Sequence, residues 1–169
     1  MPSKHLLVLG LFLGLSAMAD KKAEEKKPEF RSDEAALIEA VKKNGAKSAD
    51  GGWSPALCEI TRDWAKAMAS RYRVSTSPTG HDGFARTPNS RSERALASTQ
   101  AMVVSEVLAA TYGFEKTESE HANSCVLGWL ESPSHRREVM SKHDNFCFSM
   151  AKGGDGKYYC AGIFTDNRK

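Results

Sequence analysis

Residues 129–136 read WLESPSHR and say more about the architecture of the chain than any other stretch. Trp129 closes an apolar stripe at helical spacing, and Ser132-Pro133 has the cap and first-turn pattern that begins a new helix. His135 falls in the first turn of that helix, where the helix dipole disfavours a cation and so favours a neutral imidazole. Neutral imidazole is the form that binds metal ions. The stretch therefore predicts a break between two helices with a candidate functional histidine at the break.

Two further polar side chains lie upstream, in segments that fold separately. His81 occupies a polar loop, Gly80-His81-Asp82-Gly83, and Glu106 lies among apolar residues. An unpaired buried carboxylate is costly, so we expect Glu106 to have a partner, either His81 or His135 through a charge-assisted hydrogen bond. The alternatives are an exposed loop histidine at 81, a surface histidine at 135 and a glutamate that binds only backbone groups.

The amino-terminal 19 residues have the pattern of a signal peptide. Lys4 precedes an apolar run over 6–15, which is far shorter than the ~20 residues of a membrane span, and Ala17-Met18-Ala19 fits the cleavage rule. Residues 20–31 are charged and low in hydrophobicity, which is typical of a linker, and residues 32–165 form the expected domain. We therefore expect a secreted, extracellular protein that does not span the membrane.

The charge balance gives no indication of a nucleic-acid partner. Loss of Lys4 with the signal peptide lowers the formal net charge from +3 to +2. Arg86, Arg91 and Arg94 form the nearest thing to a basic cluster, and we interpret them as a solvated loop face. We expect a monomer without nucleic-acid binding.

Helix signals dominate the first two thirds of the chain, and strand signals dominate the end. Ser32, Ser54 and Thr117 are expected helix caps, and Glu120 completes a capping box with Thr117. Further helices are expected over 93–102 and from Pro133 to about 141, whereas 103–111 fits a helix or a strand equally well. We expect Trp64 and Trp129 in the core and a long functional loop over 74–94.

The four cysteines predict two disulfide bonds, and the carboxyl-terminal hairpin suggests how they pair. Residues around Gly153-Gly154 give a hairpin signal between two aromatic, β-prone segments. With a two-residue Gly153-Gly154 loop, Cys147 lies opposite Cys160 at a non-hydrogen-bonded pair, where Cα atoms approach to about 4.5 Å. This register predicts a Cys147–Cys160 disulfide, and a longer loop removes the match. Elimination then leaves Cys58–Cys125.

The order His81, Glu106, Trp129-x-x-Ser132-Pro133-x-His135, followed by an aromatic hairpin, resembles the CAP superfamily. This group includes the cysteine-rich secretory proteins, the antigen 5 allergens and the pathogenesis-related proteins, and its domain is often called SCP. The resemblance covers about 32–164 and implies an α+β fold. That fold is an α-β-α sandwich with helices on both faces of a small antiparallel sheet. On this pattern residues 105–110 form a strand beside the hairpin.

The resemblance also implies a cleft with two histidines and two acidic residues. His81, Glu106 and His135 match three of these positions. The fourth position is Ser132 here, and Glu131 points about 100° away from it on a helix. Val107 follows Glu106 where the family usually has asparagine. We therefore expect a cleft of His81, Glu106, His135 and Ser132 that lacks its second carboxylate.

Three functions are compatible with this cleft. The first is a secreted, disulfide-stabilised binding protein for a lipid or sterol, a divalent metal such as zinc, or an extracellular protein partner. His81 and His135 are then the candidate metal ligands. The alternative is a metal-dependent, protease-like hydrolase that uses His81, Glu106 and His135, although no serine or cysteine is an evident nucleophile. The third is a purely structural domain.

Overall fold

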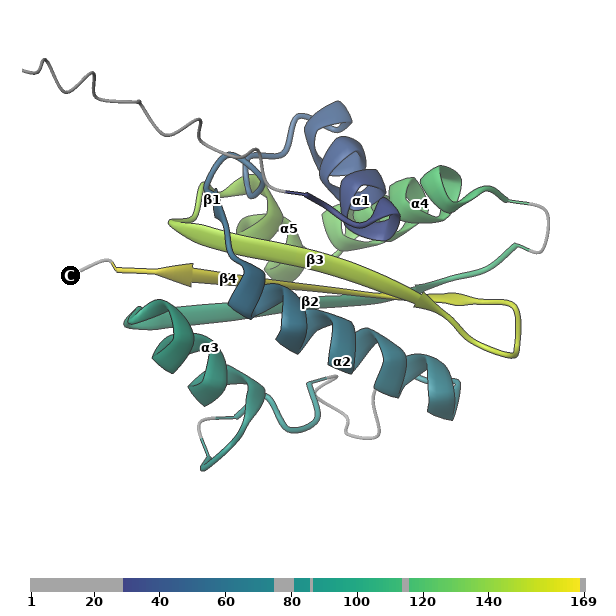
Figure 1. Ribbon diagram of the computed structural model, residues 1–169. Helices are drawn as coiled ribbons and strands as arrows, with labels where there is room; N and C mark the ends of the chain where they lie inside the picture. Colours follow the sequence, from purple (N-terminus) through teal and green to yellow (C-terminus); the bar gives the residue numbers. More distant parts are fainter. Residues whose placement is uncertain (1–28, 75–80, 86, 114–115, 168–169) are drawn as a thin grey trace, which may run out of the picture.

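Helices cover both faces of a four-stranded sheet in the computed structural model, which describes residues 29–74, 81–85, 87–113 and 116–167 (Figure 1). One layer contains α1 (Ser32–Lys43), α4 (Glu118–Glu131) and α5 (Pro133–Met140). The other contains α2 (Pro55–Arg71) and α3 (Arg91–Thr99). The expected α-β-α sandwich of the α+β class is therefore confirmed. The expected signal peptide lies outside the described residues.

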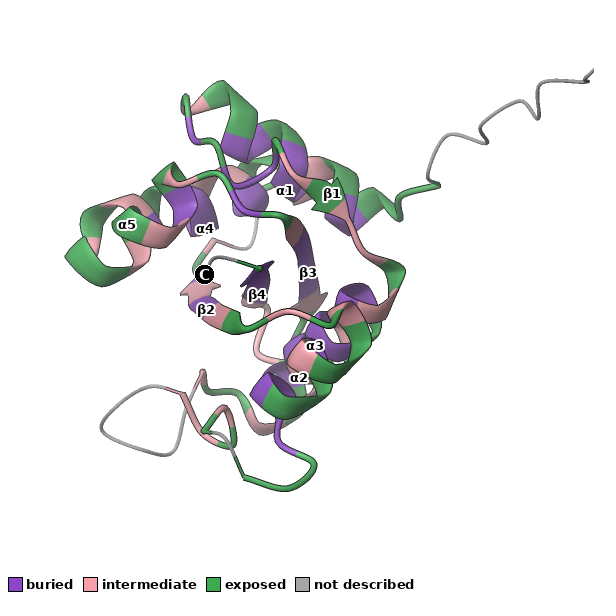
Figure 2. Cartoon of the chain, turned by 90° about the vertical axis from the view of Figure 1, so that its left-hand side faces the viewer, coloured by how far each residue is buried: buried purple, intermediate pink, exposed green. Residues whose placement is uncertain are grey.

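The sheet has the strand order β1-β3-β4-β2, with β1 (Gly52–Trp53), β3 (Asn145–Lys152), β4 (Tyr158–Asp166) and β2 (Val103–Thr111). β3, β4 and β2 pair antiparallel, and the short β1 runs parallel to the start of β3. The segment that fits a helix or a strand in isolation is β2, because its pairing with β4 fixes it in the sheet. Because β2 is last in the strand order, it is an edge strand (Figure 2).

Local signals place the helix boundaries with small differences from expectation. The Ser54 hydroxyl caps α2 by accepting from the Leu57 N–H at 3.4 Å, and Thr117 and Glu120 form the expected capping box of α4. The cap of α1 is Arg31 instead of Ser32. Helix α3 begins at Arg91, two residues before the expected start, because the Ser90 hydroxyl caps it.

Apolar side chains fill both interfaces between the sheet and the helices. Trp129, Val107 and Phe148 belong to the core between the sheet and the α1/α4/α5 layer, and all three are fully buried. Smaller cores lie beneath α2 and α3. Trp129 therefore lies in the core as expected, whereas Trp64 is only half-buried. No helix among the described residues is long and apolar enough to span a bilayer.

The expected disulfide pairing is wrong on both counts. The bonds are Cys58–Cys147 and Cys125–Cys160, with Cα atoms 5.2 and 6.4 Å apart. The cause is the hairpin loop, in which Lys152 pairs with Tyr158 and not with Asp155. The longer loop shifts the register so that Cys147 lies opposite Ile163 and Met150 lies opposite Cys160. Because side chains alternate along a strand, this odd shift sends Cys147 and Cys160 to opposite faces of the sheet.

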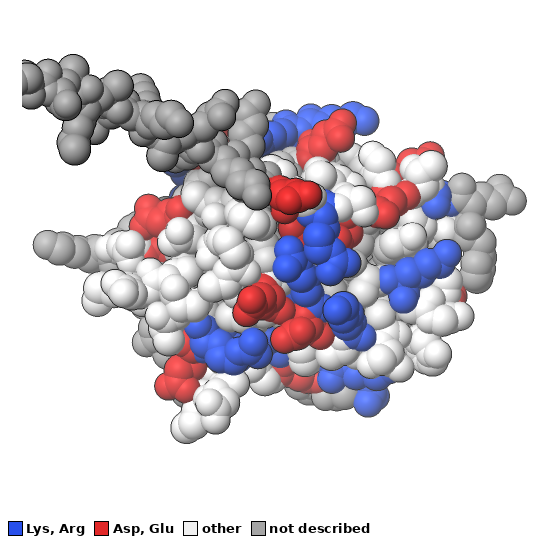
Figure 3. Space-filling view, in the orientation of Figure 1, with Lys and Arg blue, Asp and Glu red and all other residues white. Residues whose placement is uncertain are grey.

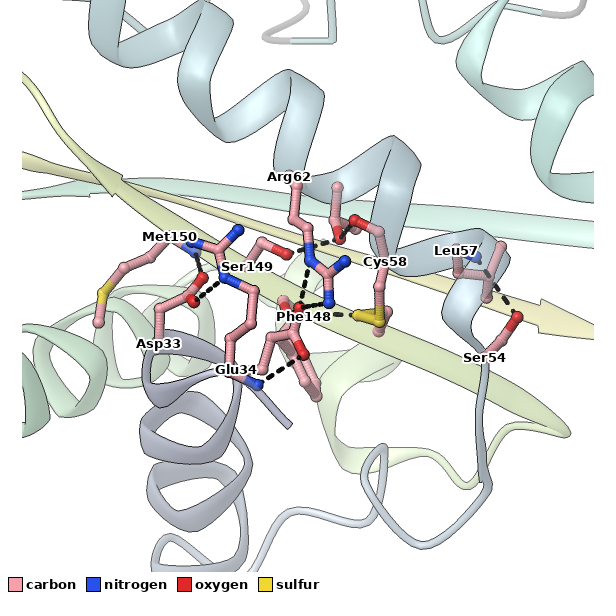
Figure 4. The surroundings of a disulfide bond; sticks show 12 residues. Asp33, Glu34, Ser54, Leu57, Cys58, Arg62, Phe148, Ser149 and Met150 are labelled. Atoms are coloured by element: carbon pink, nitrogen blue, oxygen red, sulfur yellow. Dashed lines mark hydrogen bonds and ion pairs between the residues drawn. A yellow bond between two sulfur atoms is a disulfide. The ribbon is translucent and has the colours of Figure 1, made fainter. Parts of the chain in front are cut away.

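Each disulfide joins one helical layer to the sheet. Cys58–Cys147 ties α2 to β3, and Cys125–Cys160 ties α4 to β4. Beside the first bond, the buried Glu34 of α1 forms an ion pair with the partly exposed Arg62 of α2, at 2.6 Å from its Nε (Figure 4). On the outer surface above this region, acidic and basic side chains intermingle (Figure 3). The two disulfides therefore tie both helical layers to the sheet.

Candidate ligand-binding cleft

Glu106 lies near the middle of β2 and is the buried centre of the candidate site. Its side chain is fully buried. Arg91, at the start of α3, donates from Nε to Oε1 at 2.7 Å and from Nη2 to Oε2 at 2.9 Å. Two parallel hydrogen bonds from one guanidinium are among the strongest and most directional contacts that a carboxylate can make. Glu106 is therefore an ionised, fixed group.

Arg91 is itself held from two other directions. Its Nη1 donates to the carbonyl of Asp82 at 2.5 Å. This bond fastens the loop of residues 81–85, called here the histidine loop, to α3. Its guanidinium carbon lies 3.4 Å from the ring centre of Trp64, a cation–π contact. Arg91 is therefore buried, which contradicts its expected place on a solvated loop face. Arg94 is exposed as expected, and Arg86 lies outside the described residues.

His81 completes the cluster on the cleft side. Its Nδ1 lies 2.9 Å from Oε2 of Glu106. Because an ionised carboxylate only accepts hydrogen bonds, Nδ1 carries the proton and donates. A neutral His81 ring then presents an unprotonated Nε2 as an acceptor or a ligand atom. The polar loop and the buried glutamate thus fix both the orientation and the tautomer of His81.

His135 faces His81 from the first turn of α5. The ring centres are 5.7 Å apart and the rings meet at 75°. Burial lowers the pKa of His135 below its usual value, and the charge of His81 lowers it further, against smaller opposing effects of Glu106 and Glu138. Among the described residues, neither ring nitrogen of His135 has a hydrogen-bond partner in the structure. The lowered pKa therefore favours the neutral form of the His135 ring.

A cleft of about 330 Å³ opens beside these rings, between the histidine loop, β2 and α5. Its lining consists of His81, Phe84, Val104, Ser105, Glu106, Ser134, His135, Arg137 and Glu138. Ser132 was expected in the cleft, but it does not line it. The reason is that Ser132 ends α4 and precedes α5, so the next serine, Ser134, reaches the cavity instead. The Ser132 hydroxyl makes no cap hydrogen bond and lies 3.3 Å from that of Ser134.

A second carboxylate lines the cleft at a position that sequence reasoning missed. Glu138 lies three residues after His135 on α5, so both side chains fall on one face of the helix. Its carboxylate also pairs with the neighbouring Arg137, at 2.9 Å from Nε. The i, i+3 spacing from His135 is the signal that points to Glu138. The family pattern instead places its second acidic residue at position 132, which is a serine here, so it does not indicate Glu138.

The residues present do not fit a preformed three-ligand metal site. Among the described residues, one group of three metal-ligating side chains has all its ligand atoms within 4.8 Å of one another. That group is Glu34 with Cys58 and Cys147, and the two cysteines are joined in a disulfide. His81 and His135 face each other, but Glu106 is occupied by Arg91. Among the described residues, the cleft therefore offers two imidazoles without a third ligand at metal-binding distance.

Comparison with known proteins agrees with this architecture. The family model of the cysteine-rich secretory protein (CAP) family matches residues 29–164. The chain belongs to the CAP family. This CAP domain is similar to an outer surface protein of Borrelia burgdorferi, at 18% identity and a TM-score of 0.54, over 79% of this chain and 89% of that chain. At this identity the likeness shows a shared fold. No curated protein matches the chain.

Proposed function

We propose that this CAP domain is an extracellular binding module and that its cleft receives a short segment of a partner protein beside His81 and His135. The observation that carries the proposal is the bidentate Arg91–Glu106 pair. It makes the carboxylate a fixed anchor for His81, and it leaves Nε2 of His81 and both ring nitrogens of His135 without a hydrogen-bond partner among the described residues, beside a small cavity. In this cavity, polar side chains share the lining with an aromatic wall at Phe84, so a ligand can find both hydrogen bonds and apolar contact.

The cleft is less suited to hydrolysis. A triad-like hydrolase needs a nucleophile within hydrogen-bond reach of its histidine. In the described part of the chain, neither His81 nor His135 has a hydrogen bond to a serine or threonine hydroxyl, and no free thiol is present. A water activated by zinc normally requires three protein ligands, and Glu106 is already committed to Arg91. These contacts favour binding over the metal-dependent hydrolase alternative.

The size and polarity of the cleft also distinguish between ligands. A volume of about 330 Å³ is at the lower end of the range for small-molecule sites. Histidine, serine, arginine and glutamate side chains share the lining with Val104 and Phe84. A sterol or a lipid chain needs a longer apolar enclosure, so most of its surface would remain in water. A short polypeptide segment with one or two side chains in the cleft fits better.

Selection from a library of linear peptides displayed on phage tests this function directly. We expect soluble versions of the selected peptides to bind the chain in calorimetry. His81→Ala and His135→Ala should each weaken binding about tenfold, which corresponds to about 1.4 kcal/mol. Glu131→Gln, an exposed change outside the cleft, is the matched control.

Three results contradict the proposal. The first is a selection that yields no binder, and the second is equal binding by all three variants. The third is cleavage of fluorescent casein by the chain that depends on zinc and is lost in His81→Ala. That last result instead establishes the hydrolase.

A further inference from the structure

Hydrogen bonds at β3 show which residues of the sheet turn their main-chain N–H and C=O groups toward its edges. Phe146 accepts a hydrogen bond from the N–H of Ser54, beside β1, and Met150 donates its N–H to Asp33 of α1. Both groups therefore point away from β4. In an antiparallel ladder the N–H and C=O of one residue point to the same side, and successive residues alternate. The even-numbered residues of β3 thus face away from β4.

The same alternation carries across the sheet to β2. Phe146 lies opposite Phe164 and turns its main-chain groups away from β4. Phe164 therefore makes no main-chain bond to Phe146 and turns its own groups to β2, where it pairs with Ser105. The N–H of Met102 donates to the carbonyl of Asp166 at 3.1 Å, which confirms that this side of β4 faces β2. Ser105 is thereby satisfied within the sheet. Its neighbours Val104 and Glu106 must turn their N–H and C=O groups outward, away from the sheet.

These outward groups of Val104 and Glu106, called here the β2 edge, belong to two residues that line the cleft. The side chain of Glu106 is 0% exposed, yet the whole residue is 5% exposed, so its exposed atoms belong to the main chain. Val104 and Glu106 both line the cleft. In the described chain no backbone or side-chain group outside the sheet bonds to the main chain of either residue.

The opposite edge of the sheet is protected, which makes the β2 edge distinctive. β1 pairs with the first two residues of β3. Further along β3, the Asp33 carboxylate takes the outward N–H of Met150 at 3.0 Å, as the close-up shows (Figure 4). Native proteins commonly blunt exposed strand edges in such ways, because an open edge is a template for pairing with another strand.

We propose that the β2 edge is a strand-addition site, at which an extended peptide of a partner protein pairs with Val104 and Glu106 inside the cleft. The inference rests on the proposed binding function and names the way in which the partner is recognised. Two outward N–H and two outward C=O groups with a two-residue repeat are complementary to extended backbone. A sterol, a metal ion or a helix cannot satisfy this pattern.

The walls of the cleft determine what kind of peptide fits. The lining of the cleft includes His81 and Phe84 from the histidine loop, and Ser134 and His135 from α5. An added strand points alternate side chains to these two walls. We expect an apolar side chain against Phe84 and, beside it, a hydroxyl or amide donor to Nε2 of His81. Proline is excluded at residues whose N–H pairs with the β2 edge.

The same walls exclude a second copy of this chain as the occupant. The β2 edge of a second copy lies within its own cleft, between its own histidine loop and α5. Two recessed edges cannot approach to the ~4.8 Å spacing of paired strands without collision of their walls. A single extended segment without flanking helices meets no such obstacle.

Backbone N-methylation of the phage-selected peptides tests the pairing. Each peptide is resynthesised with one N-methyl group at a time, which removes one N–H without changing a side chain. We expect at least tenfold weaker binding at alternate positions and little change between them. Peptides that depend on His135 but tolerate N-methylation everywhere reject strand addition and leave the proposed function intact. Peptides indifferent to both changes overturn both.

Two measurements on the protein give an independent result. Hydrogen exchange of the Val104 and Glu106 amides should slow at least tenfold on saturation with peptide, whereas the Ser105 amide is already protected by Phe164. Val104→Pro removes an outward N–H and no sheet hydrogen bond, so we expect at least tenfold weaker binding than for the control Val104→Thr. If Val104→Pro does not fold, the exchange measurement decides. Unchanged exchange at both amides overturns the proposal.

Discussion

Arg91 and Glu106 form a buried bidentate ion pair that joins α3 to β2 and fixes His81 at the mouth of the cleft. The same guanidinium also holds the Asp82 carbonyl, so one side chain connects the helix, the strand and the histidine loop. The site therefore depends on a residue that lies outside the cleft lining.

Arg91→Ala should destabilise the fold and disorganise the cleft. It leaves the Glu106 carboxylate buried without its main partner, and loss of one member of a buried pair typically costs about 3–5 kcal/mol. Urea unfolding measures this loss. Arg94→Ala on the same helix is the control, because Arg94 is 3.7 Å from Asp63 in an exposed pair that contributes little. Equal effects of the two changes would refute the role of Arg91.

His143 should be essential for the placement of α5, although it lies outside the cleft lining. Its ring is buried between two acceptors, the carboxylate of Asp166 at 2.8 Å and the carbonyl of Glu138 at 2.9 Å. It also stacks on Phe164. His143→Phe keeps the stacking and removes both hydrogen bonds, so we expect the free energy of unfolding to fall by about 2–3 kcal/mol.

The position of α5 provides the second readout for His143→Phe. Because the lost bond to the Glu138 carbonyl holds α5 near the sheet, the amide resonances around His135 should shift in NMR spectra. His135→Asn, which removes no hydrogen bond to the described residues, is the control for stability. Unaltered resonances around His135 would show that His143 has no positioning role.

Mild acidification should weaken the fold. Burial lowers the pKa of both His121 and His135 below the usual value of 6.5. Between the folded and unfolded pKa values the unfolded state binds more protons, so the free energy of unfolding rises with pH there. This contribution to the free energy of unfolding is fully present above pH 6.5 and is lost as the pH falls from 6.5 toward the lower pKa of the folded state. Each histidine adds at most about 1.4 kcal/mol per pH unit.

A comparison of urea unfolding at neutral and mildly acidic pH measures this dependence. His135→Asn should flatten the slope relative to the unmodified chain, because one of the two shifted histidines is gone. A slope that is the same in the variant, or a fold that gains stability on acidification, contradicts the neutral, partly buried state of His135.

The disulfide connectivity should be visible in a non-reduced digest. We expect linked peptides that contain Cys58 with Cys147 and Cys125 with Cys160. Removal of either bond by paired serine substitutions should cost about 4–5 kcal/mol, since the bonds close loops with sequence separations of 89 and 35 residues. Detection of a Cys147–Cys160 peptide would instead support a two-residue hairpin loop and a different register for β3 and β4.

Much of the fold follows from local patterns. The caps at Ser54 and Thr117 begin α2 and α4 where the sequence indicates, and the motif order around Trp129 and Ser132-Pro133 leads to the correct sandwich. The hairpin register does not follow, because it depends on the loop. Asp155 accepts from the Lys157 N–H and from the Tyr159 hydroxyl, and these contacts stabilise a longer turn than Gly153-Gly154 alone implies.

The site is predictable in part for a similar reason. Glu106 among apolar residues requires a partner, and His81 is one of the two that sequence reasoning proposes. Arg91 is missed because a single arginine between polar neighbours resembles a solvated loop residue. Only the tertiary contact of α3 with Trp64 and β2 buries it. Glu138 is missed because the family pattern directs attention to Ser132.

The tautomer of His81 is the most direct test of the central claim, that Glu106 fixes this ring and presents its Nε2 to the cleft. Long-range proton–nitrogen NMR spectra of the histidine rings, recorded at mildly alkaline pH, distinguish the two neutral tautomers. We expect His81 to carry its proton on Nδ1, where it donates to Glu106, with an unprotonated Nε2. A proton on Nε2 instead, in the chain with Arg91 and Glu106 intact, would contradict the claim.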